Sequence, residues 1–176
     1  ASYVKAPIKL STRERWGTAW GWPQDEREPA MPIDDSDMGC DCKEKCEIVP
    51  PWTRQIKTLD IREQDAITDN GQEIYNLLAG GGIDNVILMG VHLNMCVLGR
   101  PFAIRQMVNL GKNVLLIRDM TDTMYNSEKK PFVNHFRGTD LVVEHVEKYW
   151  CPTIESTDFT GKPPFRFRED PLNQKK

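Results

Sequence analysis

The sequence predicts an α/β fold with a mostly parallel central sheet. Two short, nearly continuous apolar runs, residues 85–91 and 113–119, have the composition of strands that are buried on both faces. Each run is followed by a segment of helical periodicity, and this alternation is typical of parallel strands joined by right-handed crossovers. Ligands of such sheets bind beyond the carboxyl ends of the strands. We therefore expect the functional residues at that edge.

The first predicted helix and the first predicted strand lie in succession in the part of the chain that begins at about residue 61. In GQEIYNLL, Ile74, Leu77 and Leu78 fall on one helical face, and the glycines at 80–82 end this helix. The strand NVILMGV comes next. A second helix is expected after Cys96, ending at Gly111 and carrying four apolar residues inward: Ile104, Met107, Val108 and Leu110.

The second strand, NVLLIRD, follows that glycine. The segment TDLVVEHVEKYW, residues 139–150, is amphipathic and predicts a helix that Cys151 and Pro152 end. We expect one domain over residues 1–176, with an irregular, loop-rich part at 1–59 and a motif-bearing α/β part at 60–157. The Pro-rich, charged segment at 158–176 is expected to form an arm across the surface or against another subunit.

Charge and composition exclude several classes of partner. The 26 acidic and 23 basic residues are distributed along the chain, so no basic face predicts a nucleic-acid partner and no polybasic segment predicts a membrane partner. No apolar run approaches the roughly 20 residues that span a bilayer. The odd number of cysteines, five, fits a disulfide framework poorly and favours a reducing, cytoplasmic location.

A cysteine stands at the junction between the first strand and the second helix, in GVHLNMCVLGRP, residues 90–101. In the first turn of a helix, Cys96 lies near the positive end of the helix dipole and near backbone amides, which favours its thiolate form. The same amides can stabilise an oxyanion. The alternative is a small buried side chain that fills the turn.

The sequence around this cysteine resembles the isochorismatase-like cysteine hydrolases. GVHLNMCV, GRPFAIRQM, GKNVLLIRD and TDTMY carry the resemblance, which extends from Ile61 to Thr157. It implies a three-layer α/β/α fold of the Rossmann-like kind and hydrolysis of an amide or related C–N bond. Cys96 would be the nucleophile that forms a thioester. A cis peptide is implied between Val91 and His92, with the backbone amides of His92 and Cys96 forming the oxyanion hole.

The sequence departs from the family pattern in three places. Leu93 occupies a position where the family has threonine. The family couples the cysteine to an aspartate at the end of an N-terminal strand and to a lysine, but Glu63, beside Arg62, stands at the lysine position. Glu63 is the candidate base, and Arg62 supplies charge but not easily a proton. The aspartate-bearing strand is not recognisable, so we expect a further N-terminal strand, absent from these 176 residues, beside residues 85–91.

Four residues are candidates for substrate contact because they flank the cysteine or follow the next strand: Asn94, Arg100, Asp122 and Tyr125. Arg100 could equally be a helix-surface residue, and Tyr125 an anchor of its loop. Arg137 and His135 could serve a subunit interface.

No metal or other cofactor is predicted. Cys40, Cys42 and Cys46 lie close together, but structural zinc prefers two pairs of ligands, and free thiols or a local disulfide are the favoured interpretation. The acidic run Asp34 to Asp41 lacks the spacing of a calcium loop. The histidines form no His-x-x-x-His pair.

Two classes of function remain. The first is a homo-oligomeric cysteine hydrolase that cleaves a small-molecule amide through Cys96. The second is a catalytically impaired family member that acts as a binding or structural subunit. An isochorismatase-type ether hydrolase is a lesser alternative, because that chemistry does not require a thiol.

Overall fold

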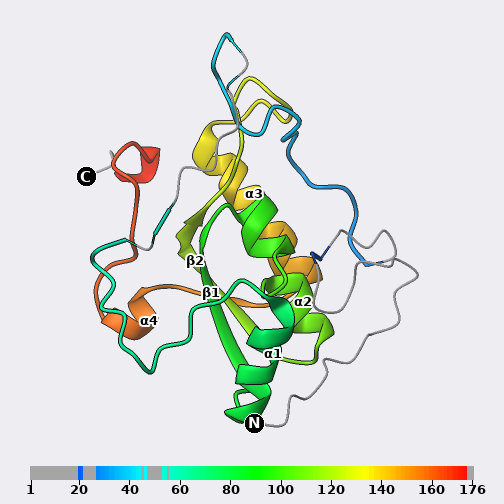
Figure 1. Ribbon diagram of the computed structural model, residues 1–176. Coiled ribbons are helices and arrows are strands. Elements are labelled where there is room, and N and C mark those ends of the chain that lie inside the picture. Colours follow the sequence, from blue (N-terminus) through cyan, green and yellow to red (C-terminus); the bar gives the residue numbers. More distant parts are fainter. Residues whose placement is uncertain (1–19, 22–26, 45, 47–52, 55, 174–176) are drawn as a thin grey trace.

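The protein has an α/β fold, as predicted, with a small parallel sheet and helices beside it (Figure 1). The computed structural model describes residues 20–21, 27–44, 46, 53–54 and 56–173. The sheet contains β1 (Asn85–Val91), β2 (Asn113–Asp122) and β3 (Thr153–Ile154) in that order, all parallel. Of the irregular part expected at residues 1–59, the segments 1–19, 22–26 and 47–52 lie outside the described residues.

The prediction that β1 is buried on both faces is wrong. Along β1, half-buried residues alternate with exposed ones, and the side chains of Ile87, Met89 and Val91 are 45%, 61% and 58% exposed. Val86 and Leu88, on the opposite face, pack against the hydrophobic core. The described helices cover only that one face of the strand. Among the described residues β1 pairs with β2 alone, so it lies at the edge of the described sheet.

The first predicted helix is confirmed as α1 (Gly71–Gly80). Asn70 caps it, because its side-chain oxygen accepts hydrogen bonds from the amides of Gln72 and Glu73 at 2.9 and 3.1 Å. The glycines that follow end the helix, and Gly82 has a positive φ of 63°.

The second predicted helix is divided in two. A π-helical turn, η1 (Leu93–Val97), follows β1, and α2 (Ile104–Asn109) begins after a break. Pro101 lies in that break, where it lacks an amide to donate and disfavours helical backbone at Arg100. Leu93, Leu98, Ile104 and Met107 are all fully buried.

β2 and α3 are both longer than predicted, at the ends that meet through Asp122 and His135. β2 continues beyond Asp119 to Asp122, and its register against β1 shifts: Leu88 pairs with Leu116, but Gly90 pairs with Thr121. α3 (His135–Tyr149) begins at His135 rather than Thr139, capped by the Asn134 side chain. α4 (Thr157–Thr160) and the short helix η2 (Pro171–Asn173) follow β3.

The hydrophobic core lies between one face of the sheet and three helices. The core contains Val86 and Leu88 of β1, Val114 and Leu116 of β2, and side chains of α1, α2 and α3 (Figure 1). No described helix combines the length and the apolar character that crossing a bilayer requires.

A buried polar cluster joins the loop at Glu28 to this helical layer. The Glu28 carboxylate lies 2.6 Å from Nη2 of Arg105 in α2 and 3.2 Å from Nε2 of His145 in α3, and it accepts a hydrogen bond from the Trp150 indole. Burial alone would raise the pKa of Glu28, but the hydrogen bond from His145 and the charge of Arg105 outweigh it and lower this pKa.

Candidate functional site

The turn after β1 holds Cys96 at the carboxyl edge of the sheet. The peptide bond between Val91 and His92 is cis, as the resemblance implies. The amides of Met95 and Val97 both donate to the His92 carbonyl oxygen at 3.1 Å, which closes the turn tightly. Cys96 lies within η1 and is partly accessible. A thiol in this position can meet a ligand that approaches the edge of the sheet.

Asn94 connects this turn to two other segments. Its side-chain Nδ2 donates to Asp35 Oδ2 at 2.8 Å and to the Met124 carbonyl at 3.2 Å, and its Oδ1 accepts from the Met124 amide at 2.9 Å. The side chain is buried. This predicted substrate-binding residue therefore uses its polar atoms within the protein, where it positions the turn.

The end of β2 carries an ion pair that sequence reasoning did not find. Val91 pairs with Asp122, so the ends of β1 and β2 are neighbours. Asp122 Oδ1 accepts from His135 Nε2 at 2.8 Å, from Thr139 Oγ1 at 3.0 Å and from the Thr123 amide at 2.9 Å. The other ring nitrogen of His135 lies 2.9 Å from the Tyr125 carbonyl oxygen.

This arrangement favours the charged form of both partners. The two nitrogens of His135 face oxygen acceptors, so the doubly protonated ring satisfies both. The hydrogen bond to Asp122 raises the pKa of His135 in spite of its partial burial. Burial alone would raise the pKa of Asp122, but the hydrogen bond from His135 and its charge lower that pKa. The sequence feature that could have indicated this pair is that Asp122 lies near the end of a predicted strand and His135 lies shortly before a predicted helix.

Tyr125 is enclosed by the same loop. Its hydroxyl donates to the Lys129 carbonyl at 2.8 Å and accepts from the Val133 amide at 3.2 Å. Its side chain is only 3% exposed, and its ring lies directly over Gly138 of α3. These contacts favour the loop-anchor interpretation of Tyr125 over a direct substrate contact.

The other predicted residues lie on exposed parts of the chain. Arg62 Nε lies 3.4 Å from Asp60 Oδ2, and Glu63 is exposed in the same loop. Among the described residues, no hydrogen bond or ion pair connects Arg62 or Glu63 with Cys96. Arg100 is exposed and its guanidinium lies 5.7 Å from the centre of the Trp20 ring. The structure therefore groups Cys96 with Asn94 and places Asp122 beside the same sheet edge.

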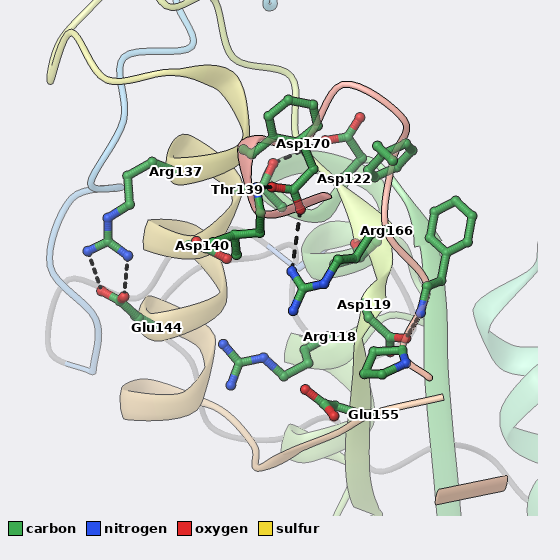
Figure 2. Close-up of a pocket in the computed structure, with 16 residues that line it drawn as sticks. Arg118, Asp119, Asp122, Arg137, Thr139, Asp140, Glu144, Glu155, Arg166 and Asp170 are labelled. Atoms are coloured by element: carbon green, nitrogen blue, oxygen red, sulfur yellow. Dashed lines mark hydrogen bonds and ion pairs between the residues drawn. The ribbon is translucent and has the colours of Figure 1, made fainter. Parts of the chain in front are cut away.

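A cavity of about 420 Å³ lies beside Asp122, between β2, α3 and the C-terminal segment (Figure 2). Its walls carry both signs of charge: Arg118, Asp119, Arg137, Asp140, Glu144, Glu155, Arg166 and Asp170. A neighbouring cavity of about 450 Å³ is lined by Asp122, His135, Phe136, Phe167, Arg168 and Glu169. Cys96 lines neither cavity, and Asp122 lines both.

Asp119 attaches the C-terminal segment that forms one wall of the larger cavity. Its carboxylate accepts hydrogen bonds from the amides of Ser156 and Phe165 at 2.8 and 2.7 Å and from the Ser156 hydroxyl. Burial acts to raise the pKa of Asp119, but these hydrogen bonds lower it. Three charged residues that line the cavity, Glu155, Arg166 and Asp170, lie on or next to this segment, which Asp119 joins to β2.

The described residues near Cys96 do not form a group of metal ligands. Within the described part of the chain, the one group of three or more convergent His, Cys, Asp or Glu side chains is Cys40, Cys42 and Cys46.

Comparison of the chain with protein-family models, curated proteins and solved structures found no match. The function is therefore argued from the site itself.

Proposed function

We propose that the protein is a cysteine hydrolase that cleaves a small amide or a related C–N bond through a thioester on Cys96. The observation that carries the proposal is the position of Cys96, partly accessible in a tight turn directly after a parallel strand. Nucleophiles are commonly presented at such strand-to-helix turns, where backbone amides gather. The resemblance of GVHLNMCV to the isochorismatase-like hydrolases supports the same chemistry.

The proposed reaction has two steps. The Cys96 thiolate attacks the amide carbonyl carbon, and the oxyanion that forms is stabilised by backbone amides of the turn, those of His92 and Cys96 in the proposal. The C–N bond then breaks, and the amine leaves with the proton that the Cys96 thiol had given to the base, Glu63 in the proposal. Water attacks the thioester, which releases the carboxylic acid and returns the thiol.

The proposal needs a group that moves protons and a group that binds the substrate. Glu63 and Arg62 remain the predicted base and cation, and both are exposed in their loop. Asp122 is the proposed substrate-binding residue, because it ends β2 beside Val91 and lines two cavities. A carboxylate kept ionised there suits a substrate that carries a hydrogen-bond donor or a positive charge. We also propose that the protein has a three-layer α/β/α architecture and assembles into a homo-oligomer.

Ammonia release from a panel of small primary amides tests the proposal. We expect activity in the wild-type protein, a loss of at least about a thousandfold in Cys96→Ser, and no loss in Cys151→Ser. Cys151 is a matched control because it is a buried thiol outside the turn. The Cys96→Ala variant should also fail to form an acyl adduct detectable by mass spectrometry. Glu63→Gln should lose about a hundredfold if Glu63 is the base.

The alternative is a binding subunit, and one observation favours it. Cys96 lines neither of the two cavities beside Asp122, so a ligand bound in them would not contact the thiol. Amide binding that weakens in Asp122→Asn, with no ammonia release from the wild-type protein, would support this second function and reject the hydrolase. Turnover of a vinyl ether that survives Cys96→Ser would instead indicate the ether hydrolase.

A further inference from the structure

Three thiols converge in the loop that precedes α1. The Sγ atoms of Cys40, Cys42 and Cys46 all lie within 4.8 Å of one another, and those of Cys40 and Cys46 are 3.4 Å apart. Two sulfurs that each lie about 2.3 Å from one tetrahedral Zn²⁺ ion are roughly 3.8 Å apart. The spacing of the three sulfurs is therefore close to that of three ligands on one metal ion.

The loop that carries these thiols is fixed to the rest of the protein. Asn126 Nδ2 donates to Asp37 Oδ2 at 3.0 Å and to the Cys40 carbonyl at 3.2 Å. Gly39 has a φ of 70°, and a Cβ atom there would lie 2.6 Å from the Tyr125 amide nitrogen. Close backbone packing on one side of Cys40 thus places the first thiol, which is what a preformed ligand site requires.

Hydrogen bonds connect the three thiols with one another. A hydrogen bond from the Cys42 amide, followed by contacts with the other two thiols, lowers the pKa of Cys40. The pKa of Cys46 is raised to about 12, first because its thiol donates to Cys40.

We propose that Cys40, Cys42 and Cys46 bind one Zn²⁺ ion as three thiolates, with water at the fourth position. Binding releases the thiol protons to solvent and transfers no electron. Among the described residues no histidine or carboxylate joins the group, and Cys42 and Cys46 are exposed, so the fourth position is open to water. The sequence alone favoured free thiols or a disulfide, because structural zinc prefers two pairs of ligands and no fourth ligand lies near the three cysteines.

Zinc is favoured over a disulfide because three sulfurs, not two, share the space. A bridge between Cys40 and Cys46 would shorten their separation from 3.4 Å to about 2.05 Å and leave Cys42 beside it without a partner. An ion satisfies all three thiols at once. It would also link Cys46 to the anchored residues around Cys40.

Titration with Co²⁺ and then Zn²⁺ tests this site in the full chain, reduced and kept free of oxygen. Co²⁺ should give the thiolate charge-transfer and tetrahedral d–d absorption bands at one ion per chain, and one Zn²⁺ should abolish them. Each of Cys40→Ser, Cys42→Ser and Cys46→Ser should weaken Zn²⁺ binding by at least about tenfold. Cys96→Ser and Cys151→Ser are matched controls that should bind Zn²⁺ as the wild-type protein does.

Circular dichroism checks that the three variants fold. We expect them to do so, because the Asp37–Asn126 hydrogen bond that attaches the loop involves no thiol. The proposal is overturned if the reduced wild-type protein binds no Co²⁺ or Zn²⁺. It is also overturned if the triple serine variant binds Zn²⁺ as tightly as the wild-type protein. Neither result depends on hydrolase activity.

Discussion

The Glu28 carboxylate and the Arg105 guanidinium form an ion pair of 2.6 Å in which both side chains are closed off from solvent. The pair joins a loop near the start of the described chain to α2, and the neighbouring His145 and Trp150 complete the contacts of Glu28. A buried pair of this kind is costly to break, because the remaining charge has no water to solvate it.

We expect Glu28→Gln to lower the free energy of unfolding by about 3 kcal/mol, measured by urea denaturation. The substituted amide would keep the shape of the side chain but leave Arg105 charged and unpaired. The exposed pair between Arg137 and Glu144 is the matched control. Glu144→Gln should cost less than about 1 kcal/mol. Equal costs at the two positions would show that Glu28 is not buried in solution.

The Asp122–His135 pair should make stability depend on pH in two directions. The raised pKa of His135 gives a contribution that is complete below about pH 6.5 and is lost as the pH rises through that raised value. The lowered pKa of Asp122 gives a contribution that is present above about pH 3.9 and is lost as the pH falls through its lowered value.

The melting temperatures of the wild-type protein and His135→Gln should therefore differ most between about pH 4 and 6.5. Thermal unfolding followed by circular dichroism across pH 3 to 9 measures this. Arg137→Gln is the control, because it removes an exposed ion pair that contains no histidine, and its difference from the wild-type protein should not follow the His135 transition. A constant difference for His135→Gln would contradict the ion pair.

A substitution that usually helps a helix should be harmful at Gly138. A Cβ atom there would overlap the Tyr125 ring, so Gly138→Ala should destabilise by about 1–3 kcal/mol although alanine favours helices. Gly80, in α1, has nothing within 4 Å of such an atom, and Gly80→Ala should be neutral or stabilising by up to about 1 kcal/mol. Chemical denaturation of the two variants compares them directly, and a stable Gly138→Ala protein would place Tyr125 elsewhere.

The two faces of β1 should respond differently to substitution. Leu88→Ala, on the core side, should cost about 2–4 kcal/mol, whereas Met89→Thr, on the exposed side, should change the free energy of unfolding by less than about 0.5 kcal/mol. Both values come from urea denaturation at several protein concentrations. A large cost for Met89→Thr would mean that this face is covered in solution.

Period and composition predicted the regular elements around the site well. α1, β1 and the body of α3 follow from local patterns of apolar residues and from end signals such as Asn70 and the glycines that follow α1. The exposure of Ile87, Met89 and Val91 could not be predicted in this way, because an apolar run is the same whether or not another element covers it.

Contacts between segments that are far apart in the chain could not be predicted from the sequence. Asp35 meets Asn94 and His135 meets Asp122 only because loops bring them together, and no local period encodes this. The candidate nucleophile was predictable because its surroundings, a strand followed by a turn, are local. Its polar partners were not predictable, since the family pattern that points to Glu63 and Arg62 does not specify contacts, and both residues lie in an exposed loop.

The bonds of Asn94 also bear on the order in which the chain folds. This single side chain joins Asp35, 59 residues earlier, to Met124, 30 residues later. Contacts over such separations form only after the entropy of closing the intervening loops has been overcome. Asn94 and Met124 are brought together when β1 and β2 pair, and the Asp35 loop can attach only to that pair. We therefore expect the loop with its thiols to be the last part of this edge to assemble and the first to detach.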